Sequence, residues 1–168
     1  MKTVLIDSSS AILLFKSGLF DHLIHRFEVI LSNSVYKELT TSAHAGSNEF
    51  KTYIQNHKMT VRHPEADNTA SRIPQLDAGE RGTILLFQKG AADFIMIDDG
   101  EGAGYCRRNQ IPYINALLFP KILLFSGIIS PEECRGRIET ILNLGRYSKE
   151  IIEYALGCDK MKVELFLP

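Results

Sequence analysis

Acidic residues end two apolar stretches of the chain, at positions where carboxylate chemistry is possible. Asp7 follows the first stretch, and Asp98 and Asp99 follow a later one. In an open parallel sheet, ligands bind beyond the carboxyl ends of the strands, where the strand order reverses. If the two stretches are neighbouring strands, Asp7 and Asp98 face one crevice. Glu38 and Glu80, which we place in the first turns of helices that start at that edge, would complete a cluster of carboxylates.

Converging carboxylates repel one another, and some of them would hold a proton at neutral pH. A divalent cation removes that repulsion, and Mg²⁺ or Mn²⁺ prefers oxygen ligands of this kind. Such a cation activates water and stabilises the charge that develops when a phosphodiester is cleaved. The acids therefore predict a Mg²⁺ or Mn²⁺ site that hydrolyses phosphodiester bonds.

Ordinary structural roles also explain each acid when it is taken singly. An Asp after a strand is often a helix cap or a turn residue. Asp77 lies three residues before Glu80, which is the spacing of a capping box, so we interpret Asp77 as a cap rather than a ligand. Glu38 alone would pass for a solvated helix position. The joint placement of the acids that end strands favours a functional role.

The composition is that of a soluble globular protein without a basic excess. The 168 residues are 45% hydrophobic and 23% charged, with a formal net charge of -1. Nucleic acid would therefore be bound through a local patch or through metal. The three cysteines form no CxxC pair, which is typical of free thiols in a reducing cytosol. The N-terminus carries no signal-peptide core, and prolines and polar residues break the apolar stretch 111–129, so we expect a cytoplasmic protein that does not span a membrane.

Short apolar runs alternate with longer segments of helical periodicity. This pattern predicts a three-layer α/β/α fold with a mainly parallel central sheet. We expect strands at Val4–Ile6, Glu28–Leu31, Met59–His63, Asp93–Ile97 and Ile111–Ile114. Ser130 and Pro131 begin a helical C-terminal part. No linker separates this part from the sheet, so we predict a single domain over residues 1–168, with the helices from about residue 130 packed onto it.

Four patterns, taken in order, resemble the PIN domain. They are Val-Leu-Ile-Asp7-Ser-Ser-Ser, Ser34-Val-Tyr-Lys-Glu38-Leu, Leu76-Asp-Ala-Gly-Glu80 and Ile95-Met-Ile-Asp98-Asp99. The chain is similar to VapC-type toxin nucleases and their uncharacterised prokaryotic relatives. The resemblance covers nearly the whole chain and extends through the apolar segment near Leu117–Phe125 to Ser130.

This resemblance implies a metal-dependent endoribonuclease, with RNA as substrate and Mg²⁺ or Mn²⁺ as cofactor. The acidic set that it implies is Asp7, Glu38, Glu80 and Asp98 or Asp99. It also implies a hydroxyl near the first acid, for which Ser8 or Ser9 is the match. Proteins of this family are often homodimers, and toxin members are held inactive by a small antitoxin protein.

One segment departs from the family pattern. Relatives usually carry a basic residue and an alanine-rich helix start after the paired acids, whereas this chain has Gly100-Glu-Gly-Ala-Gly104. Glycines weaken a helix start, and Glu101 adds negative charge where phosphate would pass. The segment therefore favours an alternative, a catalytically weak or inactive PIN-like scaffold that binds nucleic acid or protein. Arg107 and Arg108 are candidates to contact the RNA backbone, although such residues more often form a solvated helix face.

The same segment spells an Asp-x-Gly-x-Gly-x-Gly pattern that also occurs at nucleotide and S-adenosylmethionine sites. Such a loop normally follows the first strand, and an acid follows the next one. Here the next strand ends at Asn115 with no acid nearby, so we rank this class of enzyme below the nuclease. The histidines lack metal-binding spacing, so we interpret them as surface or packing residues. Cys106 lacks a placed histidine partner, so we interpret it as a buried or incidental thiol.

Overall fold

Five short apolar strands form the centre of the computed structural model, which describes residues 1–41, 46–64, 76–98 and 100–168. The strands are β1 (Thr3–Ile6), β2 (Glu28–Ser32), β3 (Met59–Arg62), β4 (Phe94–Met96) and β5 (Tyr113–Ile114). They pair in the order β3-β2-β1-β4-β5, and every pair is parallel. The predicted α/β class with a parallel sheet is confirmed. β1 and β4 are neighbours at the centre of the sheet.

Both faces of this sheet are buried, because successive residues of a strand point to opposite sides. In β1, Val4 and Ile6 belong to one apolar cluster and Leu5 belongs to another. All three side chains are fully buried. The unbroken apolar run of β1 is therefore what a strand covered on both sides requires.

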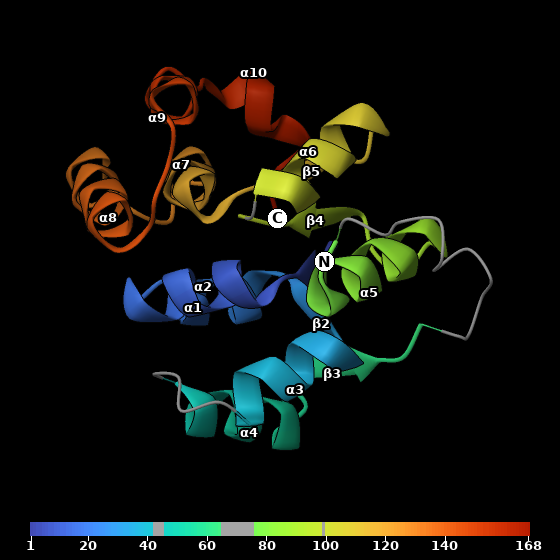
Figure 1. The fold of residues 1–168 in the computed structure, drawn as a ribbon. Helices are drawn as coiled ribbons and strands as arrows, with labels where there is room; N and C mark the ends of the chain where they lie inside the picture. Colours follow the sequence, from blue (N-terminus) through green and yellow to red (C-terminus); the bar gives the residue numbers. More distant parts are fainter. Residues whose placement is uncertain (42–45, 65–75, 99) are drawn as a thin grey trace.

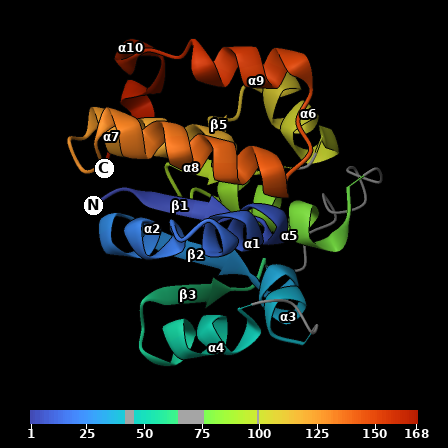
Figure 2. The same cartoon turned by 90° about the vertical axis from the view of Figure 1, so that its left-hand side faces the viewer.

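Helices cover the two faces and give the molecule its three layers (Figures 1 and 2). The face around Leu5 carries α5 (Ala78–Gln88) and α6 (Gly100–Arg108). The opposite face carries α1 (Ser8–Lys16), α2 (Phe20–Arg26), the 3-10 helix η2 (Ala116–Leu118), α7 (Phe119–Phe125) and α8 (Pro131–Leu144). Beside β3 lie α3 (Asn33–Thr41) and α4 (Ser47–Gln55), and α3 packs against both α5 and α1.

The C-terminal segment folds back onto the sheet. It consists of α9 (Lys149–Leu156), α10 (Lys160–Val163) and the 3-10 helix η3 (Glu164–Phe166). The ring of Phe166 meets the ring of Phe94 in β4 edge-on, with centroids 5.2 Å apart. Lys2 Nζ donates to the carbonyl oxygen of Leu167 at 2.5 Å. These contacts fix the end of the chain beside β4 and the N-terminus.

Some boundaries differ from the sequence predictions. The last strand is predicted from Ile111 but begins at Tyr113. Pro112 has no N–H to donate to a ladder, and the Ile111 N–H donates instead to the carbonyl of Cys106 near the end of α6. Glu38 lies in the second turn of α3 rather than in the first. Within the described ranges, no helix is both long and apolar enough to cross a membrane.

Candidate active site

Asp7 and Asp98 lie side by side at the carboxyl ends of the two central strands. Ile6 pairs in register with Met96, so the chain leaves β1 and β4 at the same level. The Asp7 N–H donates to the Met96 carbonyl (3.0 Å), and the Asp98 N–H donates to Asp7 Oδ2 (3.3 Å). Asp7 is also the N-cap of α1, because its Oδ1 accepts from the Ser10 backbone N–H at 2.8 Å. The parallel sheet thus brings these two acids into contact.

Asp98 joins three segments that are distant in sequence. Its Oδ2 accepts a hydrogen bond from the Ala116 N–H of η2 at 2.9 Å. Its Oδ1 accepts from the Tyr147 hydroxyl at 2.5 Å, and Tyr147 lies in the connection between α8 and α9. Both oxygens are therefore oriented by donors from outside the sheet. Tyr147 is a site residue that the sequence analysis missed.

The environment of the two carboxyl groups disfavours their charge. Burial, followed by the proximity of Asp98, raises the pKa of Asp7 from 3.8 to about 7. Burial also raises the pKa of Asp98, although the Tyr147 hydroxyl, the Ser10 side chain and the Ala116 N–H oppose this shift. A proton or a cation that neutralises the pair is therefore bound favourably near neutral pH.

The serine side chain that interacts with both carboxyl groups is that of Ser10. Its buried hydroxyl lowers the pKa of Asp7 and of Asp98, yet it makes no hydrogen bond of normal geometry to any described group. The sequence analysis matched Ser8 or Ser9 to this role: Ser8 is buried and Ser9 is exposed. The N-cap geometry contains the missing signal, because an Asp N-cap brings the third residue of the helix back toward its carboxylate.

Glu80 is held by the N-termini of two helices. Asp77 caps α5, and the two residues form a capping box: Glu80 N–H donates to Asp77 Oδ1 (2.8 Å), and Asp77 N–H donates to Glu80 Oε2 (3.1 Å). The other oxygen, Oε1, accepts from the Gly102 N–H in the first turn of α6 at 2.9 Å. A carboxylate near helix N-termini is stabilised by the amide dipoles that point toward it. Glu80 therefore joins the N-terminus of α5 to that of α6.

Gly102 permits this junction. A Cβ on Gly102 would lie 2.5 Å from Glu80 Oε1 and 2.3 Å from Ile97 Cδ1. The glycine-rich segment Gly100–Gly104 forms the first turns of α6 rather than a loop. The expectation that it weakens the helix start is thus incomplete, because the missing side chain lets Glu80 cap that start.

Among the described residues, Glu38 and Glu80 do not join Asp7 and Asp98 in a cluster of three or more side chains that could hold a metal. Glu38 is exposed on α3, and its Oε2 lies 3.6 Å from the position that a Cβ on Gly79 would take, at the start of α5. It therefore lies on the Glu80 side of the site. The pKa of the buried Cys106 thiol is raised to about 12, first by burial, then by Glu80 and then by Asp7. Both Glu80 and Asp7 therefore act electrostatically on this thiol. Asp99 lies outside the described residues.

Two cavities open at Asp98, and each is lined by one arginine. The smaller, about 260 Å³, is lined by Ser9, Leu13, Asp98, Gly100, Arg146 and Tyr147. The larger, about 500 Å³, extends from Asp98 past Arg107 to the C-terminal helices. Arg108 is exposed on the same helix as Arg107, and the larger cavity is not lined by it. Positive charge therefore borders the site locally, although the chain has no basic excess.

A protein-family model described as a PIN domain matches residues 3–157. The chain belongs to the PIN-domain family. PIN domains are generally nucleases, and they generally use divalent metal ions. Neither a search of curated proteins nor a search of solved structures found a match for this PIN domain.

The donor set around Asp7 and Asp98 fits a divalent cation of the Mg²⁺ type. Such a cation is often held by one or two carboxylates and keeps several waters. In this PIN domain the neighbouring Asp98 raises the cost of ionising Asp7, and the buried Ser10 hydroxyl makes no hydrogen bond to a described residue. Across the described ranges, no three Asp, Glu, His or Cys side chains are close enough to hold a metal by themselves. The fit therefore rests on two carboxylates.

Proposed function

We propose that this PIN domain is a metal-dependent endoribonuclease that hydrolyses phosphodiester bonds of RNA. The observation that carries the proposal is the pair formed by the buried Asp7 and the half-buried Asp98 at the carboxyl ends of β1 and β4, with the pKa of both groups raised. Buried like charges cost folding energy, so a pair of this kind is a functional-site candidate. Family membership supports nuclease chemistry at the same place.

In this proposal Asp7 and Asp98 hold Mg²⁺ or Mn²⁺, and Glu38, Glu80 and Asp99 are the further acids of the set. When bound, the cation supplies an activated water and stabilises the charge that develops on the phosphodiester. The Tyr147 hydroxyl and the Ala116 N–H orient the carboxylate of Asp98, and the Ser10 N–H orients that of Asp7. Fixed second-sphere hydrogen bonds of this kind keep metal ligands in a productive geometry.

RNA would approach along the side of the site that carries the arginines. Arg146 lines the smaller cavity together with Ser9, and Arg107 lines the larger one. Both arginines are exposed, and each lines a cavity together with Asp98, so each can contact a phosphate near that carboxylate. Local charge would then substitute for the absent basic surface.

The test is cleavage of a labelled single-stranded RNA with Mg²⁺ or Mn²⁺. We expect cleavage that EDTA abolishes and that the variant Asp7→Asn lacks. A matched control is Asp77→Asn, because asparagine caps a helix as well as aspartate does. If the purified protein binds Mn²⁺ by calorimetry but never cleaves, the scaffold alternative replaces the nuclease.

The resemblance to VapC-type toxins supports a finer proposal, that the nuclease is the toxin of a toxin–antitoxin pair, a homodimer held inactive by a small antitoxin. Induced expression should then arrest growth, and Asp7→Asn should abolish the arrest at equal protein level. Growth arrest that persists in the variant would contradict the toxin role without touching the chemistry.

A further inference from the structure

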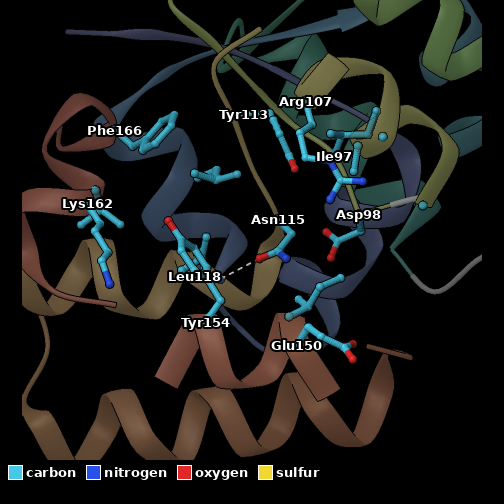
Figure 3. Close-up of a pocket in the computed structure, with 16 residues that line it drawn as sticks. Ile97, Asp98, Arg107, Tyr113, Asn115, Leu118, Glu150, Tyr154, Lys162 and Phe166 are labelled. Atoms are coloured by element: carbon cyan, nitrogen blue, oxygen red, sulfur yellow. Dashed lines mark hydrogen bonds between the residues drawn. The ribbon is translucent and has the colours of Figure 1, made fainter. Parts of the chain in front are cut away.

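The larger cavity extends from the acid pair into a space closed by the C-terminal helices. Asp98 lies at one side of it and Phe166 of η3 at the other, with Tyr113 of β5 and Tyr154 of α9 on its walls (Figure 3). Its volume of about 500 Å³ is within the range of pockets that hold small organic groups. The proposed function uses only Asp98 and Arg107 from the lining of this space and assigns no role to the rest.

The lining suits a flat, uncharged, aromatic group. Three aromatic rings and several aliphatic side chains form most of the walls. The charged groups of the lining balance in number, because Arg107 and Lys162 line the same space as Asp98 and Glu150. A phosphate would meet two acids there, whereas a neutral ring would meet apolar surface with hydrogen-bonding groups at its edge.

One polar group in the wall is available for recognition of a ring edge. Asn115 uses its Oδ1 to accept from the Leu118 N–H at 3.1 Å, so the side chain is held in place. Its amide nitrogen donates to no described residue, and the side chain lines the cavity. A fixed donor at the edge of an apolar slot is the arrangement by which proteins read base edges.

The wall that carries Tyr154 is anchored independently of any ligand. Lys121 Nζ donates to the Leu156 carbonyl (3.0 Å) at the end of α9. Phe166 packs edge-on against Phe94, and Lys162 Nζ lies 5.8 Å from the centroid of the Tyr154 ring. The residues of α10 and η3 lie beyond the segment matched by the family, 3–157. The cavity is therefore preformed, and part of its wall is outside the segment that defines the family.

We propose that this cavity binds one base of single-stranded RNA, beside the phosphate that is cleaved at Asp7 and Asp98. The inference rests on the proposed function, because it takes RNA as the substrate. Asp98 lines both cavities, so a strand that crosses Asp98 places its backbone toward Arg146 and one base in the larger space. Tyr154 stacks on that base, and Asn115 and Glu150 contact its edge. Stacking on an aromatic side chain tolerates any base, while edge contacts discriminate between bases.

The absence of tryptophan from the chain makes the test direct. Tyr154→Trp introduces a single tryptophan into the wall, and its fluorescence reports on stacking. In EDTA, so that nothing is cleaved, the variant is titrated with a five-nucleotide RNA and with versions in which one base at a time is removed. We expect quenching by the intact RNA and roughly tenfold weaker binding when one particular base is missing. Equal binding of all the abasic versions would overturn the proposal.

Variants of the wall test the same point without a reporter. Tyr154→Ala should weaken RNA binding in EDTA roughly tenfold, and Ala103→Leu, which fills the cavity from α6, should do the same while leaving Tyr154 intact. Leu156→Ala is the matched control, because Leu156 lies on the same helix and is 54% exposed but does not line the cavity. Inorganic phosphate should not displace the RNA base from Tyr154→Trp, and displacement by phosphate would show an anion site instead.

The outcomes separate this inference from the proposed function. Base-dependent quenching in a protein that never cleaves would support the cavity and overturn the nuclease. Metal-dependent cleavage with a KM and a cleavage pattern that Tyr154→Ala and Ala103→Leu both leave unchanged would support the nuclease and overturn the cavity.

Discussion

Two pairs of acids in this PIN domain contrast with each other, although each consists of two carboxylates at the ends of regular elements. In the pair Asp77 and Glu80, each carboxylate accepts the backbone N–H of the other residue. In the pair Asp7 and Asp98, Asp7 also accepts the Asp98 N–H, but burial and the neighbouring Asp98 raise the pKa of Asp7, and burial raises the pKa of Asp98. Acids opposite amide dipoles stabilise the fold, whereas acids opposite acids destabilise it until a proton or a cation arrives.

The surroundings of a carboxylate therefore decide whether it stabilises the fold or favours binding of a proton or a cation. Its place at the end of a strand or helix does not decide this. Each pair contains one helix N-cap, Asp7 for α1 and Asp77 for α5. Substitution in the Asp7–Asp98 pair should therefore change activity and spare stability. Substitution in the Asp77–Glu80 pair should change stability first.

The largest effect is expected for Asp98→Asn. Cleavage should fall on the order of 10³-fold, because the charge that holds the cation is lost. The free energy of unfolding of the metal-free protein should not fall, since a buried charge is removed and asparagine can still accept from Ala116 N–H and donate to the Tyr147 oxygen. Rate measurements on labelled RNA and urea unfolding check the two halves. A large loss of stability would mean that the pair is structural and would end the comparison.

The pH dependence of the free energy of unfolding reports the cost of ionising Asp7 beside Asp98. The pKa of Asp7 is about 7 in the folded protein and 3.8 in the reference state, so the folded protein binds the extra proton between these values. Stability in EDTA should therefore decrease as pH rises from about 4 to about 7, by up to about 4 kcal/mol, and level off above. The slope should be smaller in Asp98→Asn, and saturating Mg²⁺ should raise stability most at the high-pH end. Parallel curves for wild type and variant would contradict the assignment.

Glu80→Gln should show the opposite behaviour from Asp98→Asn. A glutamine presents one oxygen where Glu80 presents two, so either the part-buried Asp77 N–H or the buried Gly102 N–H loses its acceptor. We expect the free energy of unfolding to fall by about 1–3 kcal/mol. Glu38→Gln is the control, because an exposed substitution on a helix usually changes stability by less than about 0.5 kcal/mol. Equal unfolding midpoints for the two variants would show that the capping contacts contribute little.

The smallest effect distinguishes two glycines of α6. Gly102→Ala should destabilise the protein by about 1 kcal/mol, since the clash with Glu80 and Ile97 exceeds the gain in helix propensity. Gly100→Ala should be neutral or stabilise by up to about 1 kcal/mol, because a Cβ there meets nothing within 4 Å. Differential scanning calorimetry of the two variants checks the sign. Stabilisation by both substitutions would show that Glu80 moves away at little cost.

Local rules predict part of this site well. The convergence of Asp7 and Asp98 follows from two apolar strands ending in acids in a parallel sheet, and the Asp77–Glu80 box follows from spacing alone. The geometry of an Asp N-cap also predicts that Ser10 lies near Asp7, although the family resemblance pointed to Ser8 or Ser9. Such features depend on residues close in sequence or on one sheet edge.

Other parts depend on packing that no local pattern contains. Tyr147 reaches Asp98 across 49 positions of sequence, because α8 packs against α1 and α7 and returns the chain to the site. From the sequence of α6 alone, Gly102 is expected to weaken the helix. The close approach of Glu80 from α5 explains why a glycine stands there. The closing of a cavity by α10 and η3 likewise follows from the contact of Phe166, near the C-terminus, with Phe94 in the central strand β4.

The hydrogen bond from Tyr147 to Asp98 Oδ1 has a thermodynamic consequence for the C-terminal helices. A ligand that competes for this oxygen weakens the attachment of the connection between α8 and α9, and a partner that pulls this connection away leaves the oxygen open. The two events share one coupling free energy, so each changes the other by the same factor. A partner that binds α8 and α9 of this PIN domain therefore also changes the affinity of Asp98 for a ligand, without contacting that carboxylate.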